Sequence, residues 1–188
     1  MVTRLQAGQN VALARVLPGA SRVAVGLGWN LVQGSGPQTD VVPAVIALGQ
    51  DRKAVSPQHV AFFNQLTICD DAVGYEADGR LSGGDRERVA VDLAAVPPNV
   101  VTLVFVLYVN PDLRNPGTFD SLRSGHVRLV DRSGVEVVRY DIDTKGALGL
   151  SALVCVELYR HQSAWKLRAV GQGFTGGVRE VATVFGLP

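Results

Sequence analysis

Carboxylate side chains are concentrated in one short stretch of the sequence. Seven of the chain's 17 acidic residues lie between positions 70 and 92, and they are Asp70, Asp71, Glu76, Asp78, Asp85, Glu87 and Asp92. Carboxylates separated by glycines suit a hard cation such as Ca²⁺, which takes about six to eight oxygen ligands from loops that can wrap around it. The spacing is not that of an EF-hand, and such a run can also be a solvated loop without a ligand.

Other reactive side chains do not form a recognisable site. The histidines His59, His126 and His161 are far apart, and none has the spacing of zinc ligands. Cys69 and Cys155 lie in strand-like contexts, which indicates buried, reduced thiols. No nucleophile elbow is present. The sequence therefore gives no local support for an enzyme, and it identifies no small-molecule substrate.

A glycine-rich string near the end of the chain resembles a dinucleotide-binding motif. Gly171-Gln-Gly173-Phe-Thr-Gly176 spells G-x-G-x-x-G, but too few residues follow it for the next strand and the ribose-binding acid. We expect these glycines to serve a tight turn and close packing. A second possibility is an anion bound at the N-terminus of the last helix, near Gly176.

The elements that must position the acidic residues are mainly strands. Alternating runs at 11–16, 22–27, 88–93, 126–130 and 135–140 predict strands with one solvent-facing side. The continuous apolar runs at 100–109 and 150–159 predict central strands that are covered on both sides. Turn residues at 131–134 and 161–164 predict hairpins. Val178, Val181, Ala182 and Phe185 have helical spacing. We therefore predict a single domain over 1–188, a two-sheet β-sandwich of about ten strands with one C-terminal helix.

Composition and charge exclude several classes of protein. Hydrophobic residues make up 47% and charged residues 19%, which is typical of a globular chain rather than a disordered one. The formal net charge of +1 gives no global field for nucleic acid. No apolar run is long enough to span a membrane, and the first residues lack the apolar core of a signal peptide. We therefore predict a cytoplasmic protein.

Several strings spread over nearly the whole chain resemble the TerD family of tellurium-resistance and stress-response proteins. They are Leu5-Gln-Ala-Gly-Gln-Asn-Val-Ala-Leu13, Gly28-Trp29, Phe62-Phe63-Asn64-Gln65-Leu66, Val91-Asp92-Leu93, Glu157-Leu-Tyr-Arg-His161 and Trp165-Lys-Leu-Arg-Ala-Val-Gly-Gln-Gly-Phe174. The resemblance implies a β-sandwich without catalytic activity that binds Ca²⁺ through acidic loops at one edge. It also implies a cytoplasmic protein that works with other proteins of a stress-response assembly at the inner face of the membrane.

The same resemblance implies a set of calcium ligands, and it also shows where this chain departs from the family. The candidate ligands are Asp40, Asn64, Asp78, Asp85 and Glu87. Gln38 and Val42 stand where the family's first loop has acids, and Arg86 replaces an acid in the second loop. We therefore expect at most one good site, with weak binding. The alternative is a metal-independent interaction module in which Arg80, Arg86 and Arg88 neutralise the carboxylates.

Overall fold

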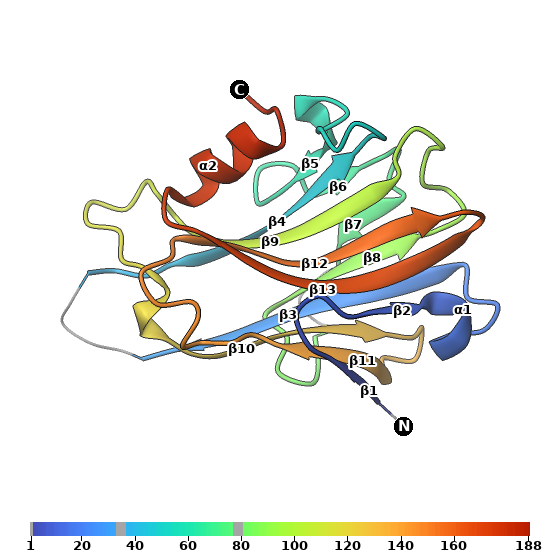
Figure 1. Ribbon diagram of the computed structural model, residues 1–188, viewed down its shortest axis with the longest axis horizontal. Coiled ribbons are helices and arrows are strands. Elements are labelled where there is room, and N and C mark those ends of the chain that lie inside the picture. Colours follow the sequence, from blue (N-terminus) through green and yellow to red (C-terminus); the bar gives the residue numbers. More distant parts are fainter. Residues whose placement is uncertain (1, 33–36, 77–80) are drawn as a thin grey trace.

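Two β-sheets packed face to face form the body of the molecule (Figure 1). The computed structural model describes residues 2–32, 37–76 and 81–188. The seven-stranded sheet has the order β1 (Thr3–Leu5), β11 (Glu136–Asp141), β10 (Leu122–Val130), β3 (Arg22–Leu31), β8 (Glu87–Asp92), β7 (Val73–Tyr75), β6 (Thr67–Ile68). The six-stranded sheet has the order β2 (Asn10–Ala12), β13 (Ala164–Phe174), β12 (Ala152–His161), β9 (Thr102–Val109), β4 (Val41–Leu48), β5 (Val60–Ala61). The predicted two-sheet fold is confirmed.

The main hydrophobic core lies between the sheets, where inward-facing side chains of both meet. Leu27 and Leu129 of the seven-stranded sheet are fully buried in the same cluster as Phe105 and Leu158 of the six-stranded sheet. A second cluster lies on the outer face of the six-stranded sheet, where helix α2 (Gly177–Val184) covers it. The strand β9 and the first half of β12 are therefore apolar on both faces, as their continuous apolar runs predict.

The remaining helical segments of the described residues are short, and one of them replaces a predicted strand. They are α1 (Leu13–Val16) and the 3₁₀ turns η1 (Pro57–His59) and η3 (Phe119–Ser121). The alternating run at 11–16 predicts one strand, but β2 ends at Ala12 and α1 begins at Leu13, whose side chain is buried in the core. Among the described residues, none of the helices is long and apolar enough to cross a lipid bilayer.

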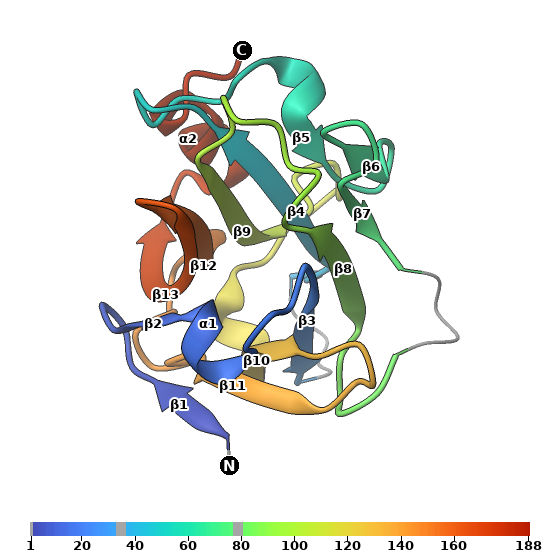
Figure 2. The same cartoon turned by 90° about the vertical axis from the view of Figure 1, so that its right-hand side faces the viewer.

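The N-terminal segment supplies an edge strand to each sheet (Figure 2). The strand β1 pairs in parallel with β11, and β2 pairs antiparallel with β13. Both hairpins predicted from turn residues are present. One joins β10 to β11 at Asp131 and Gly134, where Gly134 has a positive φ of 82°, and the other joins β12 to β13.

Candidate functional site: the acidic groove

A cavity of about 730 Å³ lies where the first residues of β4 approach the ends of β7 and β8, and we call it the acidic groove. Its lining residues are Asp40, Val41, Val42, Pro43, Phe63, Leu66, Tyr75, Glu76, Glu87 and Asn110. Three carboxylates from separate chain segments therefore share one cavity with several apolar side chains. The groove combines negative charge with an apolar wall.

Asp40 is held at the groove by the residue that follows β9. The backbone N–H of Asn110 donates to the carbonyl of Asp40 at 2.8 Å, which extends the β4–β9 ladder by one pair. The side-chain Nδ2 of Asn110 donates to Asp40 Oδ2 at 3.1 Å. Because both bonds join the same two residues, the orientation of the Asp40 carboxylate is fixed although the residue is exposed.

Glu76 and Glu87 enter the groove from neighbouring strands. Glu76 follows β7, and its backbone N–H donates to the carbonyl of Arg88 at 2.8 Å. Its Oε2 lies 3.8 Å from Arg88 Nη1, so one of the groove's carboxylates faces a cation. Glu87 is the first residue of β8. Both residues are only half-buried, so water reaches them.

The apolar wall includes two of the largest exposed hydrophobic side chains among the described residues. Phe63 is 58% exposed and Leu66 is 56% exposed, and both follow β5. The hydroxyl of Tyr75 donates to the carbonyl of Pro43 at 3.0 Å. Burial, together with the negative charge of Glu87, raises the pKa of Tyr75 far above its usual range. The phenol therefore stays a donor, and it ties the two sides of the groove together.

Asp85 does not line the groove, because its carboxylate is bound elsewhere. The side chain is fully buried and receives hydrogen bonds from Arg128 Nε at 2.6 Å and Arg88 Nη2 at 2.9 Å, with His126 Nε2 at 3.4 Å. Burial alone would raise the pKa of Asp85, but the hydrogen bonds from His126, Arg128 and Arg88 outweigh it and hold the pKa well below its usual range. Asp85 is therefore ionised and neutralised inside the protein.

The sheet is built to receive this carboxylate. Gly26 of β3 is paired with Arg88 on one side and with Arg128 on the other, so the two arginines flank it across three adjacent strands. A Cβ atom at Gly26 would collide with the Asp85 carboxylate. Ser82 belongs to the same group, because its hydroxyl accepts from Arg88 and its carbonyl accepts from Arg128. We call Ser82, Asp85, Arg88 and Arg128 the arginine cluster.

The structure thus separates the five candidate ligands. Asp40 and Glu87 share the acidic groove, whereas Asp85 belongs to the arginine cluster. Asn64 is exposed in the turn beside Phe63 but is not among the lining residues. Asp78 lies outside the described residues, as does Arg80.

The arginines expected to neutralise carboxylates behave differently from one another. Arg88 pairs with Asp85 and faces Glu76. Arg86 instead donates from Nε to the carbonyl of Trp29 at 2.7 Å and lies over its ring. Sequence reasoning missed Arg128, since it lies far along the chain from Asp85, and it missed Asn110, whose only signal is its place directly after a central strand.

The described residues fit calcium only in part. Asp40, Glu76 and Glu87 offer hard oxygen donors around one cavity that is open to water. Within the described ranges, however, no three His, Cys, Asp or Glu side chains are close enough to hold a metal ion. The described carboxylates of the groove are therefore hard oxygen donors that do not form a compact set of metal ligands.

Comparisons with known proteins agree on one family. The model of the TerD domain matches residues 1–185. "Tellurium resistance protein TerD" from Serratia marcescens is 34% identical over 190 residues, covering 100% of this chain and 98% of the relative. "General stress protein 16U" from Bacillus subtilis (strain 168) is 35% identical over 192 residues with the same coverage. The crystal structure of a TerD homologue from Streptomyces coelicolor A3(2) has a TM-score of 0.66 at 20% identity, and it covers 90% of this chain and 100% of that one.

Proposed function

Because the chain belongs to the TerD family, we propose that it is a non-catalytic, cytoplasmic stress-response protein that binds one Ca²⁺ weakly at the acidic groove. Its work is to present this groove to other proteins of a stress-response assembly. The observation that carries the proposal is that Asp40 and Glu87, which come from different sheets, line the same cavity.

The chemistry of the groove supports a hard cation. Asp40 and Glu87 would hold the ion, and Glu76 adds a third carboxylate to the same cavity. Ca²⁺ would neutralise carboxylates that otherwise repel one another across the groove. Since the ion binds the folded chain and not the unfolded one, binding stabilises the fold and shifts the population toward the bound arrangement of the groove.

The arginine cluster supports a site of low rather than high affinity. Arg88 and Arg128 occupy the oxygens of Asp85, which removes one carboxylate from the ligand set that the family resemblance implies. Affinity for Ca²⁺ depends strongly on the number of charged ligands. We therefore propose one site of low affinity.

A non-catalytic role is supported by the state of the two thiols. Burial, with the charge of Asp70 adding to it, raises the pKa of Cys69 to about 11. Burial raises the pKa of Cys155 to about 12. Both remain protonated at neutral pH, and neither has the lowered pKa that a nucleophilic or redox-active cysteine needs.

A second candidate function is a metal-independent interaction module. The observation that favours it is the pairing of Asp85 with Arg88 and Arg128, because this part of the acidic segment at 70–92 is neutralised by the chain itself. In this version the groove, with Phe63 and Leu66 exposed at its wall, contacts a partner without any ion.

Calorimetric titration of chelator-treated protein with Ca²⁺, combined with thermal unfolding, tests the proposal. We expect a binding heat at millimolar Ca²⁺, and about 2.7 kcal/mol of added stability at a concentration about a hundredfold above the dissociation constant. Asp40→Asn and Glu87→Gln should both weaken the heat and the stabilisation. Asp71→Asn is the matched control, since Asp71 is an exposed carboxylate of the same acidic segment that does not line the groove.

The outcomes separate the two candidates. Equal responses of wild type and Asp40→Asn would mean that calcium binds elsewhere. If the wild type shows neither heat nor stabilisation at millimolar Ca²⁺, the metal-independent module takes the place of the calcium proposal.

A further inference from the structure

Two arginines share one buried carboxylate on the outer face of the six-stranded sheet, away from the acidic groove. The side chain of Glu157 is 3% exposed. Its Oε1 accepts from Arg52 Nη2 at 2.6 Å, and its Oε2 accepts from Arg168 Nη2. Charge-assisted bonds of this kind hold a guanidinium in a defined orientation.

A β-bulge in β12 brings Glu157 to this face. The register shifts between Val154 and Val156 in the pairings with both β9 and β13. Cys155 and Val156 consequently both face the inner core, and Glu157 points outward, directly opposite Arg168. Without the extra residue the alternation of the strand would turn the Glu157 carboxylate into the core.

The guanidinium groups keep donors to spare. The side chain of Arg52 is 54% exposed and that of Arg168 is 38% exposed, and each uses only one nitrogen on Glu157. Arg168 Nε is buried and has no hydrogen-bond partner among the described residues. Each arginine has five N–H donors, so several donors other than the buried Arg168 Nε remain available to a partner.

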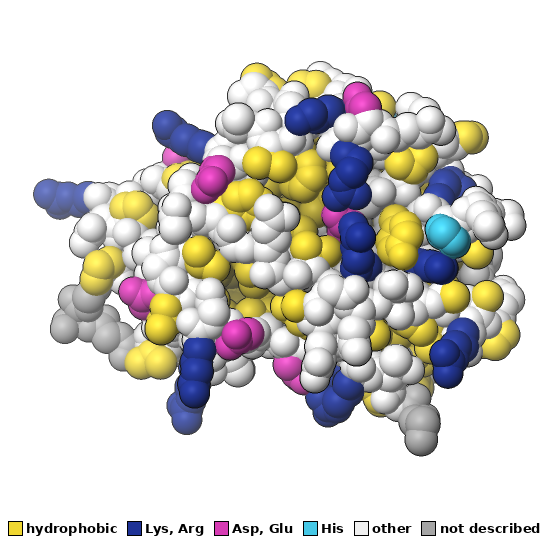
Figure 3. All heavy atoms as spheres, in the orientation of Figure 1, with side chains coloured by type: hydrophobic (Ala, Val, Ile, Leu, Met, Phe, Trp, Pro, Cys, Tyr) yellow, Lys and Arg dark blue, Asp and Glu magenta, His cyan; other side chains and the backbone are white. Residues whose placement is uncertain are grey.

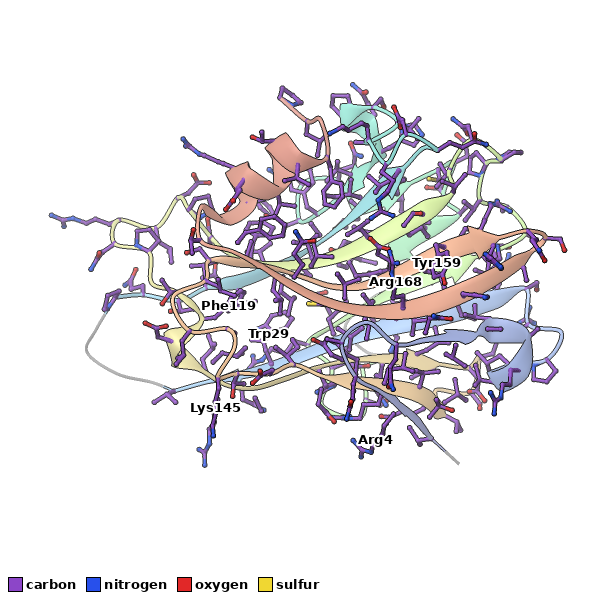
Figure 4. The ribbon with its side chains drawn as sticks, viewed as in Figure 1. Arg4, Trp29, Phe119, Lys145, Tyr159 and Arg168 are labelled. Carbon is purple, nitrogen blue, oxygen red and sulfur yellow. The ribbon has the colours of Figure 1, made fainter. Side chains whose placement is uncertain are left out.

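An aromatic ring and a third cation lie on the same face of the sheet as Arg168. The guanidinium of Arg168 lies 5.4 Å from the centre of the Tyr159 ring, and the two side chains lie together on the sheet (Figure 4). Lys166 is paired with Tyr159 in the β12–β13 ladder. Basic side chains gather over these strands in the space-filling view (Figure 3). We call Arg52, Tyr159, Lys166 and Arg168, with Glu157 beneath them, the basic surface.

We propose that the basic surface docks an acidic segment of a protein partner, one with several Asp or Glu residues in succession. Three cations against one buried carboxylate leave the surface positive, so its complement is negative. Guanidinium groups already fixed by Glu157 lose little freedom when a carboxylate binds them bidentately. Arginine and tyrosine are also the residues that most often supply the binding energy of protein interfaces.

A protein segment suits this surface better than an anionic membrane does. None of the exposed large hydrophobic side chains in the described part of the chain belongs to β12 or β13, so nothing there inserts into a bilayer. Three cations offset by Glu157 are also few for anchoring by charge alone. Successive carboxylates on a peptide can each accept two parallel hydrogen bonds from an arginine guanidinium. Binding to a mobile lipid surface does not require this bidentate geometry.

Fluorescence anisotropy with a labelled octaglutamate peptide and the full chain tests the proposal. We expect the wild type to bind with an affinity that falls with salt, and Arg168→Glu to lose about tenfold or more, the scale of a hot-spot arginine. Arg168→Lys keeps the positive charge but loses the planar guanidinium that can donate two parallel hydrogen bonds. This variant should bind the peptide less tightly than the wild type. Arg114→Glu is the matched control, because Arg114 is exposed and lies outside this surface.

Glu157→Gln separates positioning from simple charge. This variant makes the surface more positive, so general electrostatic attraction would strengthen peptide binding. Positioning by Glu157 instead predicts weaker binding, which is our expectation, and circular dichroism checks that the variant folds. Arg168→Lys gives the same discrimination if Glu157→Gln does not fold.

Three results would overturn the proposal. The first is failure of the wild type to bind the peptide, and the second is equal loss in Arg114→Glu and Arg168→Glu. The third is binding of phosphatidylserine vesicles, abolished by Arg168→Glu, without binding of the peptide, which would assign the surface to membranes.

Discussion

The Asp85 carboxylate lies over Gly26, in the space that a side chain at that position would fill. Arg88 and Arg128 reach it from the two strands on either side of Gly26. A buried anion is costly unless it is paired and hydrogen-bonded, and here it has both kinds of partner. The acidic segment therefore contains one carboxylate that serves the fold rather than a ligand.

Replacing Asp85 with asparagine should be strongly destabilising. The change removes the carboxylate nearest to two buried guanidinium groups, which keep the longer contacts to Glu76 at 3.8 Å and Glu136 at 3.6 Å. We expect a loss of about 3–5 kcal/mol in the free energy of unfolding, measured with denaturant. Asp141→Asn is the control, because Asp141 is half exposed in its pairs with Arg4 and Arg139 and should cost about 0–1 kcal/mol. Similar losses for both variants would show that Asp85 is not a buried anchor.

The loss of stability at acidic pH should depend on the same carboxylate. The pKa of Asp85 is lower in the folded protein than in the unfolded chain, so its stabilisation is present above the unfolded pKa of about 4 and is lost as the pH falls below it. Unfolding measured at a series of acidic pH values should show a steep loss of stability for the wild type. The loss should be shallower for Asp85→Asn, and parallel curves would contradict this assignment.

A methyl group at Gly26 should disturb the arginine cluster. Gly26→Ala places a Cβ where the Asp85 carboxylate lies, and we expect a cost of about 1–3 kcal/mol, the usual range for overpacking. A double-mutant cycle checks the cause: in an Asp85→Ala background the space is free, so the cost of Gly26→Ala should largely disappear. If the free-energy costs of Gly26→Ala and Asp85→Ala are fully additive, the strain caused by Gly26→Ala does not come from the Asp85 carboxylate.

Truncation of a central strand tests the core. Leu153 in β12 is 4% exposed and belongs to the main cluster, so Leu153→Ala should cost about 2–5 kcal/mol. Leu148→Ala is the same change at a side chain that is 61% exposed, and it should cost no more than about 0.5 kcal/mol. Denaturant unfolding measures both, and equal costs would contradict the assignment of Leu153 to the core.

The two thiols should be unreactive in the native state. Because Cys69 and Cys155 are buried and their pKa values are raised to about 11 and about 12, Ellman's reagent should label neither until the chain unfolds. Labelling rates with and without denaturant measure this. Fast labelling of one thiol in the native protein would identify it as accessible and reopen the question of redox chemistry.

Local sequence patterns predicted the central strands and the C-terminal helix of this fold. The continuous apolar runs became β9 and β12, which contribute side chains to both hydrophobic clusters, and the last periodic segment became α2. The run at 11–16 was predicted wrongly as one strand, because its alternation continues past Ala12 while the chain turns into α1 to bury Leu13. Local periodicity does not show where tertiary packing ends a strand.

The candidate site was harder to predict because it depends on partners that are distant in the sequence. A run of acidic residues does not show which of its carboxylates will form an ion pair with an arginine. Arg128, which pairs with Asp85, lies in a different part of the chain. The orientation of Glu157 depends on a bulge that strict alternation cannot reveal. Asp40 and Glu87 were predicted as ligands and lie in one groove, but their binding of calcium stays a prediction.

The edge strands β1 and β2 have a consequence for the order of events during translation. Their partners, β11 and β13, lie more than half the chain away, so the ribosome makes the two edge strands long before the strands on which they dock. Closure of these long loops is entropically slow. Both sheets consequently keep an unpaired edge until late in synthesis, and a nascent chain stalled before β13 would expose backbone that recruits chaperones or aggregates.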